Sequence, residues 1–122
     1  MRPLRVLLVD GNPEYLDAAS YFLTTAPGIE VVGRARSGRE ALEQVSRLHP
    51  EVVLMELFLP EMTGLAAAAQ IKALPDAPRV VFVSSRDEAP YRAEAEAAHM
   101  DGFVSKMDFC TQVRPLIEKF FE

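Results

Sequence analysis

The chain has 122 residues, of which 49% are hydrophobic, and its formal net charge is −5. This length fits one domain, 1–122, and the apolar content suffices for a packed core, which excludes a disordered chain. The 13 basic residues are scattered along the sequence, so we expect no direct binding of nucleic acid by this segment.

The first ten residues, MRPLRVLLVD, combine a basic start with an apolar centre, as a secretory signal does. Asp10 interrupts that apolar run after a few residues and no small-residue cleavage site follows, so the segment is predicted to be a buried strand. No apolar run approaches the roughly 20 residues that a membrane span needs. Cys110 is the one cysteine, which excludes an internal disulfide framework. Together these features predict a cytoplasmic protein without membrane contact.

Apolar, β-branched runs alternate with stretches of helical spacing along the whole chain. The first run, 4–10, precedes a helix whose apolar stripe extends from Tyr15 to Leu23. The second run, 29–35, precedes a helix over 37–50 that begins with Ser37 as its cap. The third run, 51–57, precedes an alanine-rich helix over 63–75.

The fourth run, 79–85, precedes a second alanine-rich helix over 87–100, and the fifth run is 102–106. The last helix, 108–122, can begin with Asp108 as its cap, and Pro115 should kink or interrupt it. Strict alternation of strands and helices predicts an α/β fold, a doubly wound, five-stranded parallel sheet covered on both faces.

In such a sheet, ligands and chemistry gather beyond the carboxyl ends of the strands. The first strand ends in Asp10, the third in Glu56, the fourth in Ser84 and Ser85, and the fifth in Lys106. Two carboxylates, hydroxyls and an ammonium are therefore expected at one edge. Glu56 follows an apolar run, where an unpaired carboxylate is costly, so Lys106 is its expected partner.

At these residues the sequence resembles, over essentially its whole length, the receiver domain of bacterial two-component response regulators. The segments SGREALEQV and AHMDGFVSK resemble the subfamily that carries a LuxR-type helix-turn-helix module. The resemblance implies a flavodoxin-like (βα)5 fold with strand order 2-1-3-4-5. In that family an acidic pair after the first strand helps to hold Mg²⁺, and an aspartate ending the third strand accepts a phosphoryl group. Pro60 and Gly64 stand at the positions that shape the loop after the phosphoacceptor.

The resemblance also assigns a supporting hydroxyl to Ser84, the supporting lysine to Lys106 and the aromatic switch position to Phe103. Two positions depart from the family pattern. Glu56 stands at the phosphoacceptor position, and the acidic pair is reduced to Asp10 followed by Gly11. Since Mg²⁺ demands near-octahedral oxygen ligands, we expect weak Mg²⁺ binding at most, no other cofactor and no catalytic residue. Met107 follows Lys106 where many receivers carry a proline, a smaller departure.

The favoured hypothesis is a phosphorylation-independent, non-enzymatic receiver domain that regulates a partner or an attached output domain. Its expected partners are a histidine kinase or another signalling protein, and a C-terminal DNA-binding output domain. One alternative is a working Mg²⁺-dependent phosphoacceptor in a phosphorelay that controls transcription. Another is a flavodoxin-like cofactor binder, disfavoured because the turn VDGNPEYL lacks a glycine-rich or hydroxyl-rich phosphate cradle.

Individual residues leave narrower alternatives open. Glu56 either pairs with Lys106 in an inactive site, which we favour, or mimics the phosphorylated state. A glutamate carries one negative charge, whereas a phosphoryl group carries nearly two. Asp10 is a residual metal ligand or a helix cap, and Asn12 could cap that helix equally well. Ser84 satisfies a loop amide or detects the charge at Glu56, and Phe103 can be plain packing.

The last helix offers more apolar surface than one core-facing stripe requires. The apolar residues are Val113, Leu116, Ile117, Phe120 and Phe121. We therefore expect a weak homodimer, or a docking surface for an output domain, centred on this helix. The alternative is that a kink at Pro115 turns both phenylalanines inward.

Overall fold

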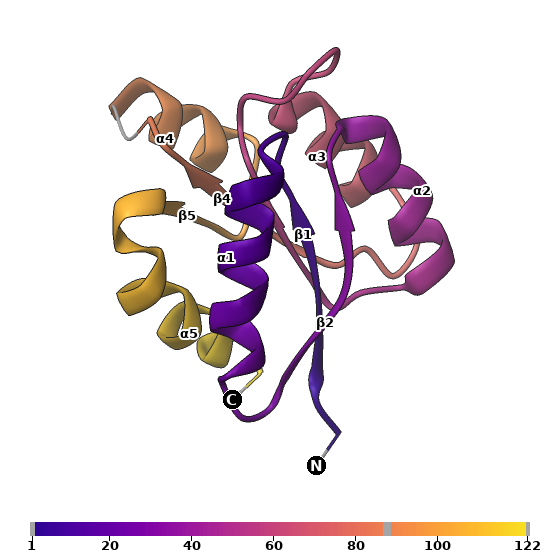
Figure 1. Ribbon diagram of the computed structural model, residues 1–122. Helices are drawn as coiled ribbons and strands as arrows, with labels where there is room; N and C mark the ends of the chain where they lie inside the picture. The colour runs from indigo at the N-terminus through magenta and orange to yellow at the C-terminus, as the bar shows by residue number, and fades with distance from the viewer. Residues whose placement is uncertain (1, 87–88, 122) are drawn as a thin grey trace.

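The computed structural model describes residues 2–86 and 89–121, in which five parallel strands alternate with five α-helices (Figure 1). The strands are β1 Leu4–Val9, β2 Ile29–Ala35, β3 Val52–Met55, β4 Arg79–Ser84 and β5 Gly102–Ser105. The helices are α1 Pro13–Thr24, α2 Gly38–Leu48, α3 Gly64–Lys72, α4 Ala89–Ala97 and α5 Phe109–Phe120, and a 3₁₀ turn, η1 Lys106–Asp108, precedes α5.

The strands pair in the order β2-β1-β3-β4-β5, and every pair is parallel. This arrangement confirms the predicted fold class and strand order. All five strands point the same way, so the segments that follow them share one edge of the sheet. That edge lies at the top of Figure 1.

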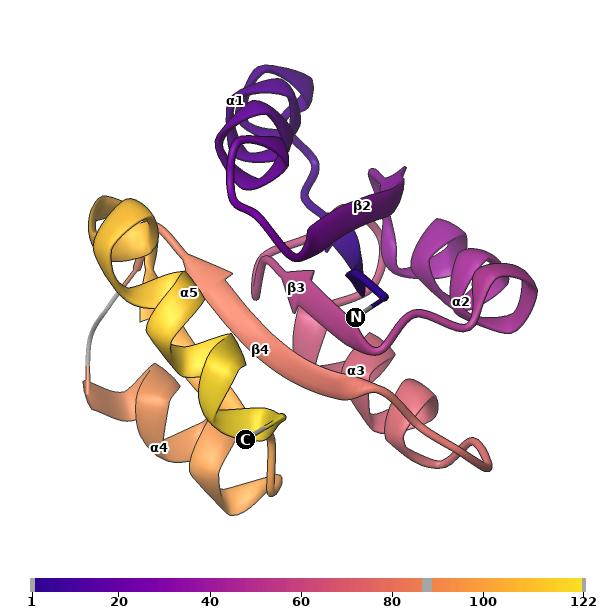
Figure 2. The same ribbon diagram turned by 90° about the horizontal axis from the view of Figure 1, so that it is seen from below.

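Helices cover both faces of the sheet, and each face has its own core. Figure 2 shows α1 and α5 on one side and α2 and α3 on the other. Side chains of β4 illustrate the division, since Val80 and Phe82 pack with α2 and α3 whereas Val81 and Val83 pack with α1 and α5. This alternation between two apolar faces is why the strand sequences read as unbroken hydrophobic runs.

Helix starts follow the sequence signals closely. Ser37 caps α2 by accepting the amide of Glu40, as predicted. Asn12 caps α1, because its side chain accepts the amides of Glu14 and Tyr15. Of the two predicted caps for this helix, Asn12 and not Asp10 is therefore the correct one.

The predicted strand over 51–57 is too long, because β3 ends at Met55. Glu56 lies one residue beyond the strand, where its own side chain accepts the next two amides and turns the chain away from the sheet. The predicted helix over 87–100 corresponds to α4, although its first two residues lie outside the described ranges. Glu122, at the end of the last predicted helix, also lies outside them.

Two predictions for the last helix hold only in part. Asp108 occupies the cap position of α5, but its side chain makes no capping hydrogen bond. Pro115 does not interrupt α5, which runs from Phe109 to Phe120 through it. Proline removes the bond to the carbonyl of Thr111, and both residues are exposed, so water can satisfy that carbonyl.

The apolar residues of α5 are also less available than expected. Val113 and Ile117 are buried in the core, and Leu116 and Phe120 pack against it. Phe121 is 48% exposed, so it alone of the five expected surface residues remains largely open. The apolar surface left on this helix is therefore smaller than expected, and Phe121 remains outward rather than turned inward. Among the described residues, no helix is both long and apolar enough to cross a membrane.

Candidate functional site

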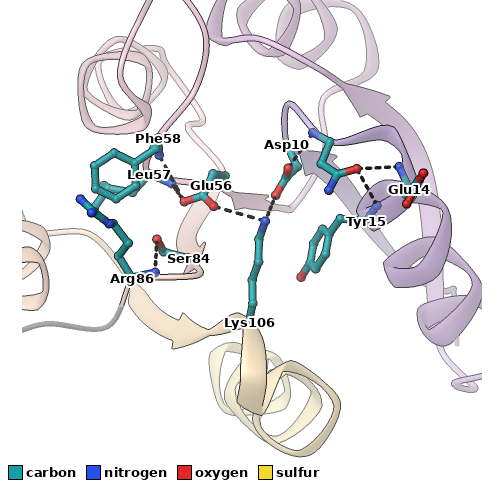
Figure 3. A network of polar contacts seen from close by, with 10 residues as sticks. Asp10, Glu14, Tyr15, Glu56, Leu57, Phe58, Ser84, Arg86 and Lys106 are labelled. Atoms are coloured by element: carbon teal, nitrogen blue, oxygen red, sulfur yellow. Dashed lines mark hydrogen bonds and ion pairs between the residues drawn. The ribbon is translucent and has the colours of Figure 1, made fainter.

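The Lys106 ammonium lies between two buried carboxylates at the carboxyl edge of the sheet (Figure 3). Its Nζ is 2.7 Å from Asp10 Oδ2 and 3.3 Å from Glu56 Oε1. Asp10 follows β1, Glu56 follows β3 and Lys106 follows β5, so the parallel topology brings together residues far apart in sequence. The predicted pairing of Glu56 with Lys106 is confirmed.

Glu56 is held by its own loop as well as by Lys106. Its residue is 5% exposed, and Oε2 accepts the amides of Leu57 at 2.6 Å and Phe58 at 3.2 Å. Oε1 faces Lys106. Both carboxylate oxygens thus have donors, which offsets the cost of burying the charge.

Asp10 is equally buried and uses its two oxygens in the same divided way. The residue is 4% exposed, Oδ1 accepts the amide of Asn12 at 2.9 Å, and Oδ2 faces Lys106. Two carboxylates and one ammonium leave this cluster with a formal charge of −1.

Tyr15, at the start of α1, supports the ammonium from a third direction. Lys106 Nζ lies 4.2 Å from the centre of the Tyr15 ring, a cation–π contact, and the ring meets Phe109 edge-on at 6.0 Å. Its hydroxyl is buried and has no hydrogen-bond partner among the described residues. Burial, with added repulsion from the charges of Asp10 and Glu56, raises the pKa of the Tyr15 hydroxyl well above its ordinary range. Tyr15 is therefore neutral at physiological pH.

Ser84 lies at the same edge but bonds to its own loop. Its Oγ accepts the amide of Arg86 at 3.1 Å, and the residue is fully buried. This hydrogen bond fits the hypothesis that Ser84 satisfies an amide of its own loop. Phe103 packs against the core of the α2 and α3 face, and the Arg92 guanidinium lies 4.7 Å from its ring centre. This contact fits the packing alternative for Phe103.

The loop after Glu56 depends on Gly64. A Cβ at this glycine would lie 2.2 Å from the carbonyl oxygen of Glu56 and 2.9 Å from the Cα of Leu57. The Gly64 amide donates to the carbonyl of Leu57 at 2.8 Å. Since these are backbone atoms, they cannot move aside cheaply, and glycine is required where α3 begins beside the site.

This edge offers Mg²⁺ fewer carboxylate ligands than the family pattern that the sequence resembles. Within residues 2–86 and 89–121, no group of three or more His, Cys, Asp or Glu side chains is arranged to hold a metal ion. Gly11 brings no side-chain oxygen, and its carbonyl lies 3.4 Å from the guanidinium of Arg36. The Lys106 ammonium already contacts one oxygen of each carboxylate. Two cationic groups thus border the space where the resemblance places a divalent ion.

A second group of side chains closes one flank of the site and was not predicted from the sequence. Phe58 and Tyr91 meet edge-on at 5.1 Å, and the Arg86 guanidinium lies 5.3 Å from the Phe58 ring centre. Arg86 Nη1 also donates to the Tyr91 hydroxyl at 3.1 Å. No spacing signal links these three residues, because they come from two separate loops and a helix. The Tyr15 contact was missed for a related reason, since its helical spacing indicates only a core stripe.

Comparison with known proteins gives a match to the family model described as the response regulator receiver domain, over residues 6–114. The response regulator protein VraR of Staphylococcus saprophyticus is 32% identical over 122 residues, which is 98% of this chain and 57% of that protein. A LuxR-family two-component response regulator from Aurantimonas sp. SI85-9A1 has a solved structure with a TM-score of 0.90 at 25% identity. The alignment covers 97% of this chain and 84% of that one.

A protein-glutamate methylesterase/protein-glutamine glutaminase of Myxococcus xanthus is 42% identical over 86 residues. That match covers 70% of this chain but 25% of the methylesterase. The chain thus spans between about a quarter and somewhat more than half of these curated relatives.

Proposed function

Because this chain belongs to the response regulator receiver domain family, we propose that it is an atypical receiver that signals by protein–protein contact without being phosphorylated. The observation that carries the proposal is the Lys106 ammonium, which bridges Asp10 and Glu56. In the receiver family that the sequence resembles, this edge of the sheet is expected to hold Mg²⁺ and an aspartate phosphoacceptor. Here a tethered cation takes the place of the metal ion, and a glutamate takes the place of the aspartate.

The geometry of Glu56 supports this proposal. Its carboxylate is one methylene further from the backbone than that of an aspartate, and Oε2 is folded back onto the amides of Leu57 and Phe58. Phosphoryl transfer depends on close positioning of the nucleophile, the metal ion and the donor. Glu56 Oε2 already accepts two amides, and position 11 is a glycine that provides no carboxylate for the metal ion. Glu56 is therefore poorly placed for that reaction.

The bridged pair also favours an inactive site over a mimic of the phosphorylated state. Lys106 neutralises one of the two carboxylate charges, so the cluster carries less negative charge than a phosphoryl group would add. We propose that Glu56 stabilises one fixed conformation of this edge, which a partner then recognises.

For the whole protein, we propose a cytoplasmic regulator of transcription in which this segment acts on a DNA-binding output domain and responds to a histidine kinase or another signalling protein. Support comes from the likeness to VraR and to a LuxR-family regulator. The methylesterase relative is an enzyme by its name, but the chain matches only a quarter of it. We assign no enzymatic activity to this segment.

Incubation with acetyl phosphate and Mg²⁺, read by intact mass, tests the proposal. The parent is expected to stay unmodified, whereas the double variant Gly11→Asp with Glu56→Asp should gain a phosphoryl adduct. The change at position 11 is sterically feasible, because a Cβ there would meet Pro60 Cδ at 3.3 Å and could be relieved by the ring pucker. A parent that forms the adduct would instead support the Mg²⁺-dependent phosphoacceptor.

If the double variant folds but stays inert, its remaining departures from the family pattern become the next targets. Met107, which is 92% exposed beside Lys106, is the first of these. The single variant Glu56→Asp is the matched control, because it restores the acceptor without the second metal carboxylate. Comparing the single and double variants separates the loss of the nucleophile from the loss of the metal ligand.

A further inference from the structure

Phe58, Arg86 and Tyr91 form a contact that we call the aromatic clasp, and it joins the site to α4. The guanidinium of Arg86 lies 5.3 Å from the Phe58 ring centre and 6.0 Å from that of Tyr91. The two rings pack edge-on, and Arg86 donates to the Tyr91 hydroxyl. Figure 3 shows Arg86 alongside the Phe58 ring, on the flank of the site opposite Asp10.

Two members of the clasp are bonded to site residues through their backbone. The Phe58 amide donates to Glu56 Oε2 at 3.2 Å, and the Arg86 amide donates to Ser84 Oγ at 3.1 Å. The clasp is thus anchored at the ends of β3 and β4 and reaches α4 through Tyr91. A change in the Glu56 carboxylate acts directly on the residue that carries one of the two rings.

Helix α4 buries little apolar surface, although its Arg92 contacts the ring and the carbonyl of Phe103 in β5. Ala95 is the one fully buried residue of the described helix, and Tyr91 is half-buried against the core of the α2 and α3 face. An element with so little buried apolar surface opens locally at low cost. The clasp is therefore one of two contacts described here that hold the first turns of α4, the other being that of Arg92 with Phe103.

We propose that the aromatic clasp couples the Glu56 carboxylate to the position of α4, so that the charge and hydrogen bonds of Glu56 hold this helix in one place. Weakening the bond from the Phe58 amide to Glu56 loosens the ring pair, and loosening the ring pair frees α4. The coupling uses Phe58, Arg86 and Tyr91 and needs no phosphoryl group.

Hydrogen exchange of the α4 amides tests the coupling. The relevant amides are those of residues 93–97, because earlier amides of the helix have no acceptor within it. Arg86→Ala removes both the cation–π contacts and the hydrogen bond, so exchange there should rise about tenfold. Glu56→Gln should produce a similar rise, although position 56 does not touch α4. Arg39→Ala, an exposed arginine on α2, is the control and should leave α4 exchange unchanged.

The double variant Glu56→Gln with Arg86→Ala decides whether the two act through one contact. If they do, α4 exchange in the double variant is no faster than in the faster single variant. Multiplication of the two single effects would overturn the proposal, as would a folded Glu56→Gln protein whose α4 exchange matches the parent. Tyr91→Phe keeps both rings and removes the hydrogen-bond acceptor, so it should give a smaller rise than Arg86→Ala.

If Glu56→Gln does not fold, the reverse effect, from the clasp to the Glu56 hydrogen bond, provides a second measurement. Coupling is reciprocal, so Arg86→Ala should also speed exchange of the Phe58 amide, which bonds to Glu56 rather than to Arg86. Unchanged Phe58 exchange in a folded Arg86→Ala protein would refute the coupling from the other side.

Discussion

Lys106 determines the chemistry of this site because its ammonium forms ion pairs with two carboxylates at once. An ion pair buried to this extent is tolerable only when each partner has further donors or acceptors. The amides of Asn12, Leu57 and Phe58 supply those donors. The remaining face of the ammonium lies over the Tyr15 ring. One oxygen of each carboxylate is therefore oriented by local backbone amides, and the other faces Lys106.

Tyr15 gives the first prediction at this scale. Tyr15→Phe keeps the ring under Lys106 and removes a buried hydroxyl that has no partner in the described chain, so stability at pH 7 should stay within about 0.5 kcal/mol of the parent. Tyr15→Leu loses the cation–π contact and the edge contact with Phe109, and it should lose about 1–2 kcal/mol. Urea denaturation measures both; equal losses in the two variants would contradict the role of the ring.

The raised pKa of Tyr15 adds a pH dependence to the same comparison. A hydroxyl with a higher pKa in the folded state binds its proton more tightly there, so its contribution is present below the unfolded pKa, near 10, and is lost as pH rises through the folded value. The parent should therefore lose more stability than Tyr15→Phe when the pH is raised above about 10.

Sequence reasoning located Asp10, Glu56, Ser84 and Lys106 at one edge because each follows a strand in a parallel sheet. The sequence could not predict that the Tyr15 ring lies against the Lys106 ammonium. Helical spacing indicates which face of a helix is buried, but it does not indicate which side chain from another element packs on that face. Contacts between side chains of separate elements depend on packing, which a single sequence leaves open.

At the scale of elements, the start of α3 is fixed by backbone contact with the loop after Glu56. Gly64→Ala would place a Cβ 2.2 Å from the Glu56 carbonyl oxygen, so it should destabilise the protein by about 3 kcal/mol or more. Gly11→Ala, whose Cβ would meet only Pro60 Cδ closer than 3.4 Å, is the control. Thermal unfolding compares them, and a Gly64→Ala protein as stable as the control would show that the loop can rearrange.

Asp101 joins three elements near the opposite ends of the strands. Its carboxylate accepts the Val80 amide at 2.7 Å, Lys72 Nζ at 2.9 Å and Arg79 Nη1 at 3.3 Å. Burial alone would raise the pKa of Asp101, but the Val80 amide and the Lys72 ammonium outweigh it and hold the pKa below its usual range. Sequence reasoning did not find this network, because Lys72, Arg79 and Asp101 come from three separate segments of the chain.

Asp101→Asn should lower the free energy of unfolding at pH 7 by about 2 kcal/mol. Since the folded pKa is depressed, the contribution of Asp101 is present above the ordinary carboxylate pKa, near 4, and is lost as pH falls through the folded value. The parent should therefore lose more stability than Asp101→Asn on acidification below about pH 4. Denaturation across a pH series checks this, and parallel curves for the two proteins would contradict it.

At the scale of the whole molecule, the fold was predictable because alternation of strands and helices leaves few topologies. The surface was harder, since the same apolar residues of α5 serve as core or as interface depending on how the helix rotates. Val113 and Ile117 turn inward, and Phe121 stays 48% exposed. One exposed phenylalanine supports at most a small interface.

We therefore still expect a weak homodimer, or a docking site for an output domain, now centred on Phe121. Sedimentation at increasing concentration should show the parent approaching a dimer, and Phe121→Ser should shift it toward monomer. Tyr21→Ser is the control, because Tyr21 is 75% exposed on α1. A parent that remains monomeric at the highest concentration would leave only the docking role.

We propose that the Lys106 ammonium is the cation of this site in place of Mg²⁺. Titration calorimetry with Mg²⁺ measures that directly, with Gly11→Asp plus Glu56→Asp as the comparison. We expect no saturating isotherm for the parent at millimolar Mg²⁺ and tighter binding by the double variant, which regains a second carboxylate after β1. A saturating isotherm for the parent with micromolar affinity, abolished by Asp10→Asn, would contradict it.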